Sequence, residues 1–129
     1  MKALSVVEPW GDMIASGKKS LEVRSWHPNE IPMKNIALVQ NSIRLTKDGQ
    51  EDPAGKIVAI IDIDGCKPWV KSDSEPAGCV ESEFVEGYLA WEVANVRKLN
   101  KPIDVVAKRK FYELSEFEIA ALRKEFETQ

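Results

Sequence analysis

Three charged side chains that could bind an anion lie close together between Gly17 and Trp26. Lys19 and Arg24 are cations, and Glu22 between them is a carboxylate that can hold either one in place. Such a group can contact a phosphate or the edge of a base, and arginine is the better bidentate partner. If the chain is instead an enzyme, Lys19 and Glu22 are the residues we expect to transfer protons.

Aromatic and basic residues elsewhere in the chain can extend this site. Trp10, Trp26, Tyr88 and Trp91 are aromatic residues on which an unpaired base could stack, a contact worth about 1 to 3 kcal/mol per base. Packing in the core is the alternative role for Trp10. Lys108 and Arg109 lie on a turn between two expected strands and can continue the basic path. We therefore include Trp10, Trp26, Tyr88 and Lys108 among the expected ligand-binding residues.

A short helix and a strand must position the charged group. The helical pattern begins at Pro9 and ends at Gly17, a residue that adopts positive φ at a helix C-terminus without a Cβ penalty. Alternation along the following strand places Glu22 and Arg24 on one face. Lys19 lies where the helix gives way to the strand, so its long stem can turn to either face and join them.

The remaining pattern favours a small barrel. Further strands are expected at 2–7, 36–40, 55–64, 87–96, 101–106 and 110–114. Residues 66–83 are expected to form a long loop, or a lid that can include a turn of helix. Ser115 and Glu118 form a capping box that begins a terminal helix, with Ile119, Leu122 and Phe126 on one face. Six or seven short strands with two helices predict an α+β fold, a closed or nearly closed mixed β-barrel capped by short helices.

Several other polar and reactive residues are not expected to take part in a functional site. Asp62 and Asp64 share a face at the end of strand 55–64, where we expect them to meet solvent. No histidine or further acidic run stands nearby, so no metal or other cofactor is expected. Cys66 and Cys79 are interpreted as free thiols, because their spacing does not suit a metal site. The one histidine, His27, lies in a proline-containing loop and is expected at the surface.

Composition limits the classes of protein to consider. With 129 residues and 43% hydrophobic content, the chain is expected to form one domain, residues 1–129, with a full core. A net charge of −3 argues against non-specific binding of polyanions over the whole surface but allows a local basic cleft. No apolar run reaches membrane-spanning length, so a cytoplasmic protein without a membrane partner is the default expectation.

Taken in order, these features resemble the ASCH domain, a member of the PUA-like superfamily. The matching pieces are Ala3-Leu4-Ser5 followed by Pro9-Trp10, then Gly17-x-Lys19-x-x-Glu22-x-Arg24 with Ser25-Trp26, then the strands 55–66 and 88–95 with Pro102-Ile103 after them. The second piece matches the family's signature motif, and the resemblance spans nearly the whole chain. It implies a β-barrel with a cleft across one end, lined by Lys19, Glu22 and Arg24.

The resemblance also implies a range of functions. Members of the superfamily bind RNA or modified bases, and relatives include modules of transcription coactivators, a bacterial ribonuclease and a bacterial amidohydrolase that acts on acetylcytidine. That amidohydrolase uses a lysine and a threonine of the motif with a distant glutamate. Lys19 matches the lysine, but Glu22 stands in place of the threonine, which weighs against this activity. Glu8 replaces a glutamine common in coactivator-like members. A carboxylate at the edge of the cleft would disfavour a phosphate, and Glu8 can instead pair with Arg24 or Lys19.

We therefore expect a protein that binds RNA, or another single-stranded nucleic acid, or a modified nucleoside in the cleft. The alternative is a small metal-independent hydrolase of ribonuclease or amidohydrolase type. A third class is a protein-interaction module that uses the acidic segment 73–86 or the terminal helix. Dependence of nucleic-acid binding on Lys19 and Arg24 distinguishes the first class from the third.

Overall fold

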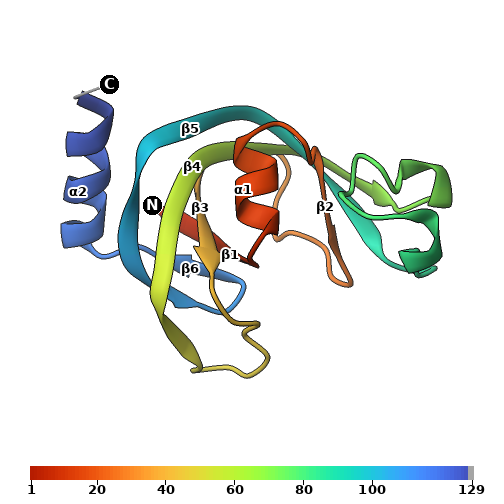
Figure 1. The fold of residues 1–129 in the computed structure, drawn as a ribbon, viewed down its shortest axis with the longest axis horizontal. Coiled ribbons are helices and arrows are strands. Elements are labelled where there is room, and N and C mark those ends of the chain that lie inside the picture. The colour runs from red at the N-terminus through yellow and green to blue at the C-terminus, as the bar shows by residue number, and fades with distance from the viewer. Residues whose placement is uncertain (128–129) are drawn as a thin grey trace.

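The computed structural model describes residues 1–127 and contains one six-stranded mixed sheet with two α-helices (Figure 1). The strands are β1 (Lys2–Val7), β2 (Leu21–Arg24), β3 (Met33–Asn41), β4 (Glu51–Pro68), β5 (Leu89–Lys108) and β6 (Phe111–Glu113). The helices are α1 (Trp10–Ala15) and α2 (Glu116–Glu127), with single 3-10 turns η1 (Lys71–Asp73) and η2 (Glu81–Glu83) between β4 and β5. The predicted α+β class is confirmed.

The sheet is curved but its two edges are not paired. The strand order is β2-β5-β4-β3-β1-β6, in which β1 pairs with β3 in parallel and the other neighbours are antiparallel. The long strands β4 and β5 run side by side and bend around the molecule (Figure 1). Within residues 1–127 no backbone ladder joins β2 to β6, so the barrel is open. We call the gap between β2 and the β1–β6 pair the seam.

Both faces of the central strands are buried, as their apolar composition predicts. Leu38 of β3 packs in a cluster that includes Ile14 and Ala15 of α1. Its neighbour Val39 points the other way, into a cluster that includes Leu122 of α2. Helix α1 therefore covers one face of the sheet and α2 the other.

Two local predictions are confirmed at the helix ends. Gly17 adopts φ +83° directly after α1. The backbone N–H of Ser115 donates to the Glu118 carboxylate over 2.8 Å, and the Glu118 N–H donates to the Ser115 hydroxyl over 3.1 Å. Ile119 and Phe126 pack beside Leu122 on the second cluster, as the helical spacing predicts.

The prediction of two separate strands at 87–96 and 101–106 is wrong, because β5 is one continuous strand. Ile103 pairs with Ile57 and Lys98 pairs with Ala59, so five steps along β5 match two along β4. Pro102 lies in the resulting bulge, where a missing backbone donor costs no ladder hydrogen bond. The polar segment that was expected to separate two strands lies in this bulge.

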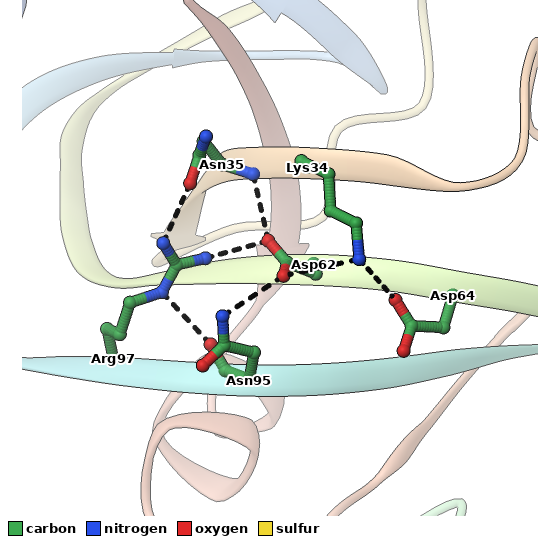
Figure 2. Close-up of polar contacts among 6 residues, drawn as sticks. All are labelled: Lys34, Asn35, Asp62, Asp64, Asn95 and Arg97. Atoms are coloured by element: carbon green, nitrogen blue, oxygen red, sulfur yellow. Dashed lines mark hydrogen bonds and ion pairs between the residues drawn. The ribbon is translucent and has the colours of Figure 1, made fainter.

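The placement of Asp62 at a solvent-facing strand end is also wrong, because β4 continues to Pro68 and Asp62 is only 4% exposed. Its carboxylate accepts hydrogen bonds from the Asn35 backbone N–H at 2.9 Å, the Asn95 amide at 3.1 Å and the Arg97 guanidinium at 2.7 Å (Figure 2). Asn35 and Asn95 both have positive φ, and register shifts interrupt both neighbouring ladders here. Asp62 therefore satisfies polar groups freed by irregular pairing.

Candidate functional site

The three charged residues of the motif meet in the structure as predicted. Glu22 and Arg24 lie on one face of β2, with the Arg24 Nε 2.8 Å from Oε2 of Glu22. Lys19 lies just before the strand and turns toward the same face, with its Nζ 3.5 Å from the other carboxylate oxygen. Each oxygen of Glu22 thus holds one cation.

Lys19 is a buried lysine whose side chain is 5% exposed. Its ammonium donates to the backbone carbonyl of Leu21 at 2.7 Å and to that of Ala77, in addition to its contact with Glu22. Burial lowers the pKa of Lys19, and the nearby Glu22 carboxylate opposes this effect. The three protons of the ammonium all have acceptors, so Lys19 ties the motif to the loop that contains Ala77.

Arg24 joins the two sides of the seam. Its Nη2 donates to the backbone carbonyl of Ser5 on β1 at 2.7 Å, while its Nε is held by Glu22. Aromatic rings continue the contact: Trp26, just after β2, lies edge-on to Phe111 of β6 with centroids 5.7 Å apart. Trp91 stacks on Phe111 at 5.7 Å. Side chains therefore close the barrel where the backbone does not.

A pocket of about 480 Å³ opens at this seam. It is lined by Ser5, Val6, Val7, Trp10, Lys19, Glu22, Val23, Arg24, Ser25, Trp26, Asn41, Arg44, Leu45, Trp69, Ala77, Cys79, Glu83, Val85, Tyr88, Arg109 and Lys110. These residues come from β1, the motif, the start of the β3–β4 connection, the loop of residues 69–88 and the β5–β6 turn. Five of them are cations and two are carboxylates, so the lining carries an excess of three positive charges in a chain of net charge −3.

The expected aromatic residues line this pocket. Trp10 at the start of α1 has the Lys19 ammonium 5.4 Å from its ring centroid. Trp26 lies beneath two cations, with the Lys110 Nζ 5.1 Å and the Arg24 guanidinium carbon 5.9 Å from its ring. Tyr88 is 39% exposed just before β5. The ring faces of Trp10 and Trp26 are partly occupied by the protein's own cations. Trp91, the other aromatic residue considered for stacking, is fully buried and does not line the pocket.

Lys108 is the expected site residue that the structure does not bring to the pocket. It lines a second groove between β5, β6 and α2, and its Nζ lies 3.9 Å from Glu51. Glu8 is exposed, does not line the pocket and forms no ion pair with Arg24 or Lys19 among the described residues. His27 is exposed, as predicted.

Sequence reasoning missed Arg44, Lys110 and Asn41. Arg44 lies in a polar connection directly after a buried strand, and only the curvature of the sheet brings it to the motif. Lys110 follows the expected basic turn and adopts φ +61°, a conformation that the residue type lysine does not predict. Asn41 ends β3, and its Oδ1 has no hydrogen-bond partner in residues 1–127. The polar ending of the strand at Asn41 was the only available signal.

The loop of residues 69–88 forms one wall of the pocket. It overlaps the segment that was expected to be a loop or lid, and backbone hydrogen bonds anchor it to the motif. The N–H groups of Ser20 and Leu21 donate to the carbonyl of Pro76 at 2.9 and 3.1 Å. Gly78 has φ +78°, and a Cβ there would lie 3.2 Å from both Lys19 Cδ and Met13 Cε. Glycine at this position suits the positive φ and avoids a tight contact with the stem of Lys19.

The cysteines are both free thiols, as predicted, and Cys79 lines the pocket. Burial raises the pKa of the Cys66 thiol. Across residues 1–127, no three His, Cys, Asp or Glu side chains are grouped so that they could hold a metal ion. No helix in the same range has the length and apolar character needed to span a membrane.

Comparison with known proteins identifies the family and the fold. The sequence matches the ASCH domain family over residues 4–103. No curated protein gives a sequence match. The crystal structure of ASCH from Zymomonas mobilis is similar with a TM-score of 0.66 and 15% identity, covering 95% of this chain and 93% of that one. Its serine-to-alanine and tyrosine-to-phenylalanine mutants give TM-scores of 0.58 and 0.57 at 14% identity, over 95% of this chain and 94% and 96% of theirs. The structures share the fold, and the family match shows that the chain belongs to the ASCH domain family.

Proposed function

We propose that this ASCH domain binds single-stranded RNA and that the pocket at the seam holds one of its nucleotides. The observation on which the proposal rests is the charge of the pocket, an excess of three positive charges in a chain of net charge −3. A local basic pocket in an acidic protein concentrates a polyanion at one place on the surface. Binding of nucleic acid is also the general property of the family.

The shape and lining of the pocket support one nucleotide as the unit that is bound. Its volume of about 480 Å³ is within the range of small-molecule sites. Trp10, Trp26 and Tyr88 present aromatic surface on which an unstacked base can lie. Unstacked bases are available in single strands but not in a duplex. Arg24 keeps its Nη1 without a hydrogen bond among the described residues, so it can donate to a ligand.

The proposal is tested by titrating short single-stranded RNA, the matching DNA and free modified nucleosides against the wild type and Tyr88→Ala. Tyr88 is 39% exposed and its side chain forms no hydrogen bond with the motif, so its removal is expected to leave the fold intact. We expect affinity to fall by about tenfold or more in the variant, the loss of one stacking contact. We expect a salt slope of log affinity near −2, about three phosphates at roughly −0.7 each. Equal and salt-independent binding by both proteins would overturn the proposal.

A metal-independent hydrolase is the second candidate, and one observation favours it. Lys19 lies at the pocket wall with a lowered pKa, and a lysine of this kind can act as a general base. Its ammonium is, however, engaged by the carbonyls of Leu21 and Ala77 and by Glu22. Transfer of a proton to or from a substrate requires one of these contacts to break, so binding is the function that the geometry supports best.

The hydrolase candidate has its own test. RNA recovered after incubation with the wild type and with Lys19→Met is analysed on a gel, and acetylcytidine is assayed for release of acetate. Cleavage of RNA or acetylcytidine by the wild type, but not by Lys19→Met, would favour the hydrolase over the binding module. Intact RNA and intact acetylcytidine with both proteins would leave the protein as a binding module.

A further inference from the structure

We propose that Arg44, Arg109 and Lys110 form a phosphate subsite in the pocket, separate from the motif, so that the preferred ligand is a nucleotide rather than a nucleoside. This inference rests on the proposed function and adds to it the place and chemistry of phosphate recognition. The phosphate can belong to a free mononucleotide or to an RNA strand, because both present the same phosphate ester.

The cations of the motif are mostly occupied within the protein. Lys19 directs its ammonium at two backbone carbonyls and at Glu22. Arg24 is held by Glu22 through Nε and by the Ser5 carbonyl through Nη2. Glu22 also neutralises one of the two positive charges. A phosphate therefore meets few available donors at the motif and must find them elsewhere in the pocket.

Three other cations that line the pocket have donors to spare. Arg44 and Lys110 form no ion pair with any side chain of residues 1–127. Arg109 pairs with Asp48 at 2.8 Å, but Asp48 is 95% exposed, and an ion pair so open to solvent contributes little. A phosphate in the pocket can compete with Asp48 for the Arg109 guanidinium, because it accepts charge-assisted hydrogen bonds bidentately.

Both segments that present these cations are held in place. The Asp52 carboxylate accepts hydrogen bonds from the N–H of Ser42 at 2.6 Å and its hydroxyl at 2.9 Å, which holds the connection that contains Arg44. Ser5 holds the β5–β6 turn: its N–H donates to the carbonyl of Lys110 at 3.2 Å, and its hydroxyl donates to the carbonyl of Lys108. The carbonyl of Ser5 accepts from Arg24, so one residue positions the turn relative to the motif.

Lys110 has a backbone conformation that supports a role at a site. Its φ of +61° is in the left-handed region, where a lysine is less stable than a glycine. Residues held in this region concentrate at binding and active sites. Here the conformation accompanies a Lys110 ammonium that lies 5.1 Å from the Trp26 ring centroid, at the pocket.

The pocket is chemically divided along the seam. Its three additional cations come from the β3–β4 connection and the β5–β6 turn, on the β3-β1-β6 side of the sheet. The loop of residues 69–88, which leads into β5 beside β2, contributes no cation; it contributes Trp69, Val85 and Tyr88 together with the carboxylate of Glu83. A ligand with a phosphate at one end and a base at the other matches this division.

The test compares uridine, cytidine, adenosine and guanosine with their 5′- and 3′-monophosphates and with a pentauridylate strand, using tryptophan fluorescence. For the wild type we expect at least one monophosphate, or the strand, to bind about tenfold or more tightly than the nucleoside. We expect Arg44→Ala and Lys110→Gly each to remove most of that advantage. Lys108→Ala is the matched control, since it removes a neighbouring charge outside the pocket. Inorganic phosphate is expected to compete with the nucleotides for the wild type.

Lys110→Gly separates charge from folding, because glycine is favoured at a φ of +61° and the variant is expected to melt no lower than the wild type. A preference for the strand over every mononucleotide would identify the source as RNA backbone and would support the subsite. If nucleosides bind as tightly as nucleotides, or if Lys110→Gly and Lys108→Ala behave alike, the subsite is wrong while the proposed function stands. If the wild type binds no nucleoside, nucleotide or strand, the proposed function itself fails.

Discussion

The Arg24 guanidinium donates a 2.7 Å hydrogen bond to the backbone carbonyl of Ser5 across the gap that separates β2 from β1. In the sheet order β2 is one edge strand and β1 lies next to the other edge strand, β6, so the bond joins regions that the backbone ladder leaves apart. Glu22 holds the same guanidinium through Nε. The signature motif thus has a structural role at the seam as well as a place in the pocket lining.

This bridge predicts that Arg24→Ala lowers the free energy of unfolding by about 1.5 to 3 kcal/mol, the contribution of hydrogen bonds to a charged group. The protein is expected to remain folded at 25 °C. Arg24→Lys cannot reach both Glu22 and Ser5 with fork geometry, so its loss is expected to be intermediate. Urea denaturation measures all three proteins. Equal stability of Arg24→Ala and the wild type would mean that the bridge contributes nothing.

The buried Lys19 predicts a pH dependence of stability. Burial lowers its folded-state pKa below the usual value of about 10.4. Between these two values the unfolded chain binds the proton that the folded chain has lost, so stability rises with pH in that window. Lys19→Met is expected to lack this part of the rise, whereas Lys18→Met, at an exposed neighbour, is expected to keep it. Urea denaturation from pH 7 to pH 10 compares the slopes; parallel slopes for all three would contradict the assignment.

Gly78 predicts an effect of packing that can be separated from backbone strain. Gly78→Ala places a methyl group 3.2 Å from Lys19 Cδ at a residue with φ +78°. Gly17→Ala introduces similar strain at φ +83°, with no atom within 4 Å of the new Cβ. Strain alone costs about 1 to 2 kcal/mol, so Gly17→Ala is expected to lose about that much and Gly78→Ala more. Thermal unfolding decides, and equal losses would show that the loop yields without cost.

The Asp62 network predicts a loss of stability in acid (Figure 2). The hydrogen bond from the Asn35 backbone N–H, with those of Asn95 and Arg97, holds the pKa of Asp62 below its usual value. Its stabilising effect is therefore complete above the unfolded value of about 3.9 and is lost as pH falls through the lower folded value. Asp62→Asn is expected to cost about 1 to 3 kcal/mol at pH 7 and to weaken the acid dependence.

Asp64→Asn is the matched control for this prediction. Asp64 lies two residues further along β4, is half exposed and pairs with Lys34 at 3.1 Å. An exposed ion pair contributes about 0 to 1 kcal/mol, so this variant is expected to stay close to the wild type. Equal losses at the two positions would show that net charge, rather than the network, sets the stability.

Local patterns predicted the parts of the fold that depend on neighbouring residues. The capping box at Ser115, the turn at Gly17 and the shared face of Glu22 and Arg24 each follow from spacing within a few residues. The bulge at Pro102 could not be predicted in this way, because the length of the partner strand decides whether a polar stretch breaks a strand or leaves the ladder. Irregular pairing also surrounds Asp62, which was expected at a strand end and instead lies buried within β4 in a network of hydrogen bonds.

The pocket was predicted in part for the same reason. Trp10 and Trp26 lie near the motif in the sequence, and Tyr88 was included for its aromatic ring; all three line the pocket, but Lys108 was expected where Lys110 is found. The two lysines are two residues apart, and the left-handed conformation of Lys110 in the turn between them was not predicted. Lys110 therefore lines the pocket, whereas Lys108 lines the second groove. Arg44 reaches the pocket only because the sheet curves until its two edges approach, a property of the whole sheet rather than of the segment around Arg44.

The most direct test of the central claim, that RNA occupies the pocket at the seam, is an NMR titration that follows the four tryptophan indole N–H signals. We expect the signals of Trp10 and Trp26 to shift and saturate as a short single-stranded RNA is added. Backbone amides of Val106 and Phe117, in the second groove, are expected to stay unchanged. Saturable shifts confined to that second groove, with Trp10 and Trp26 unmoved, would contradict the account.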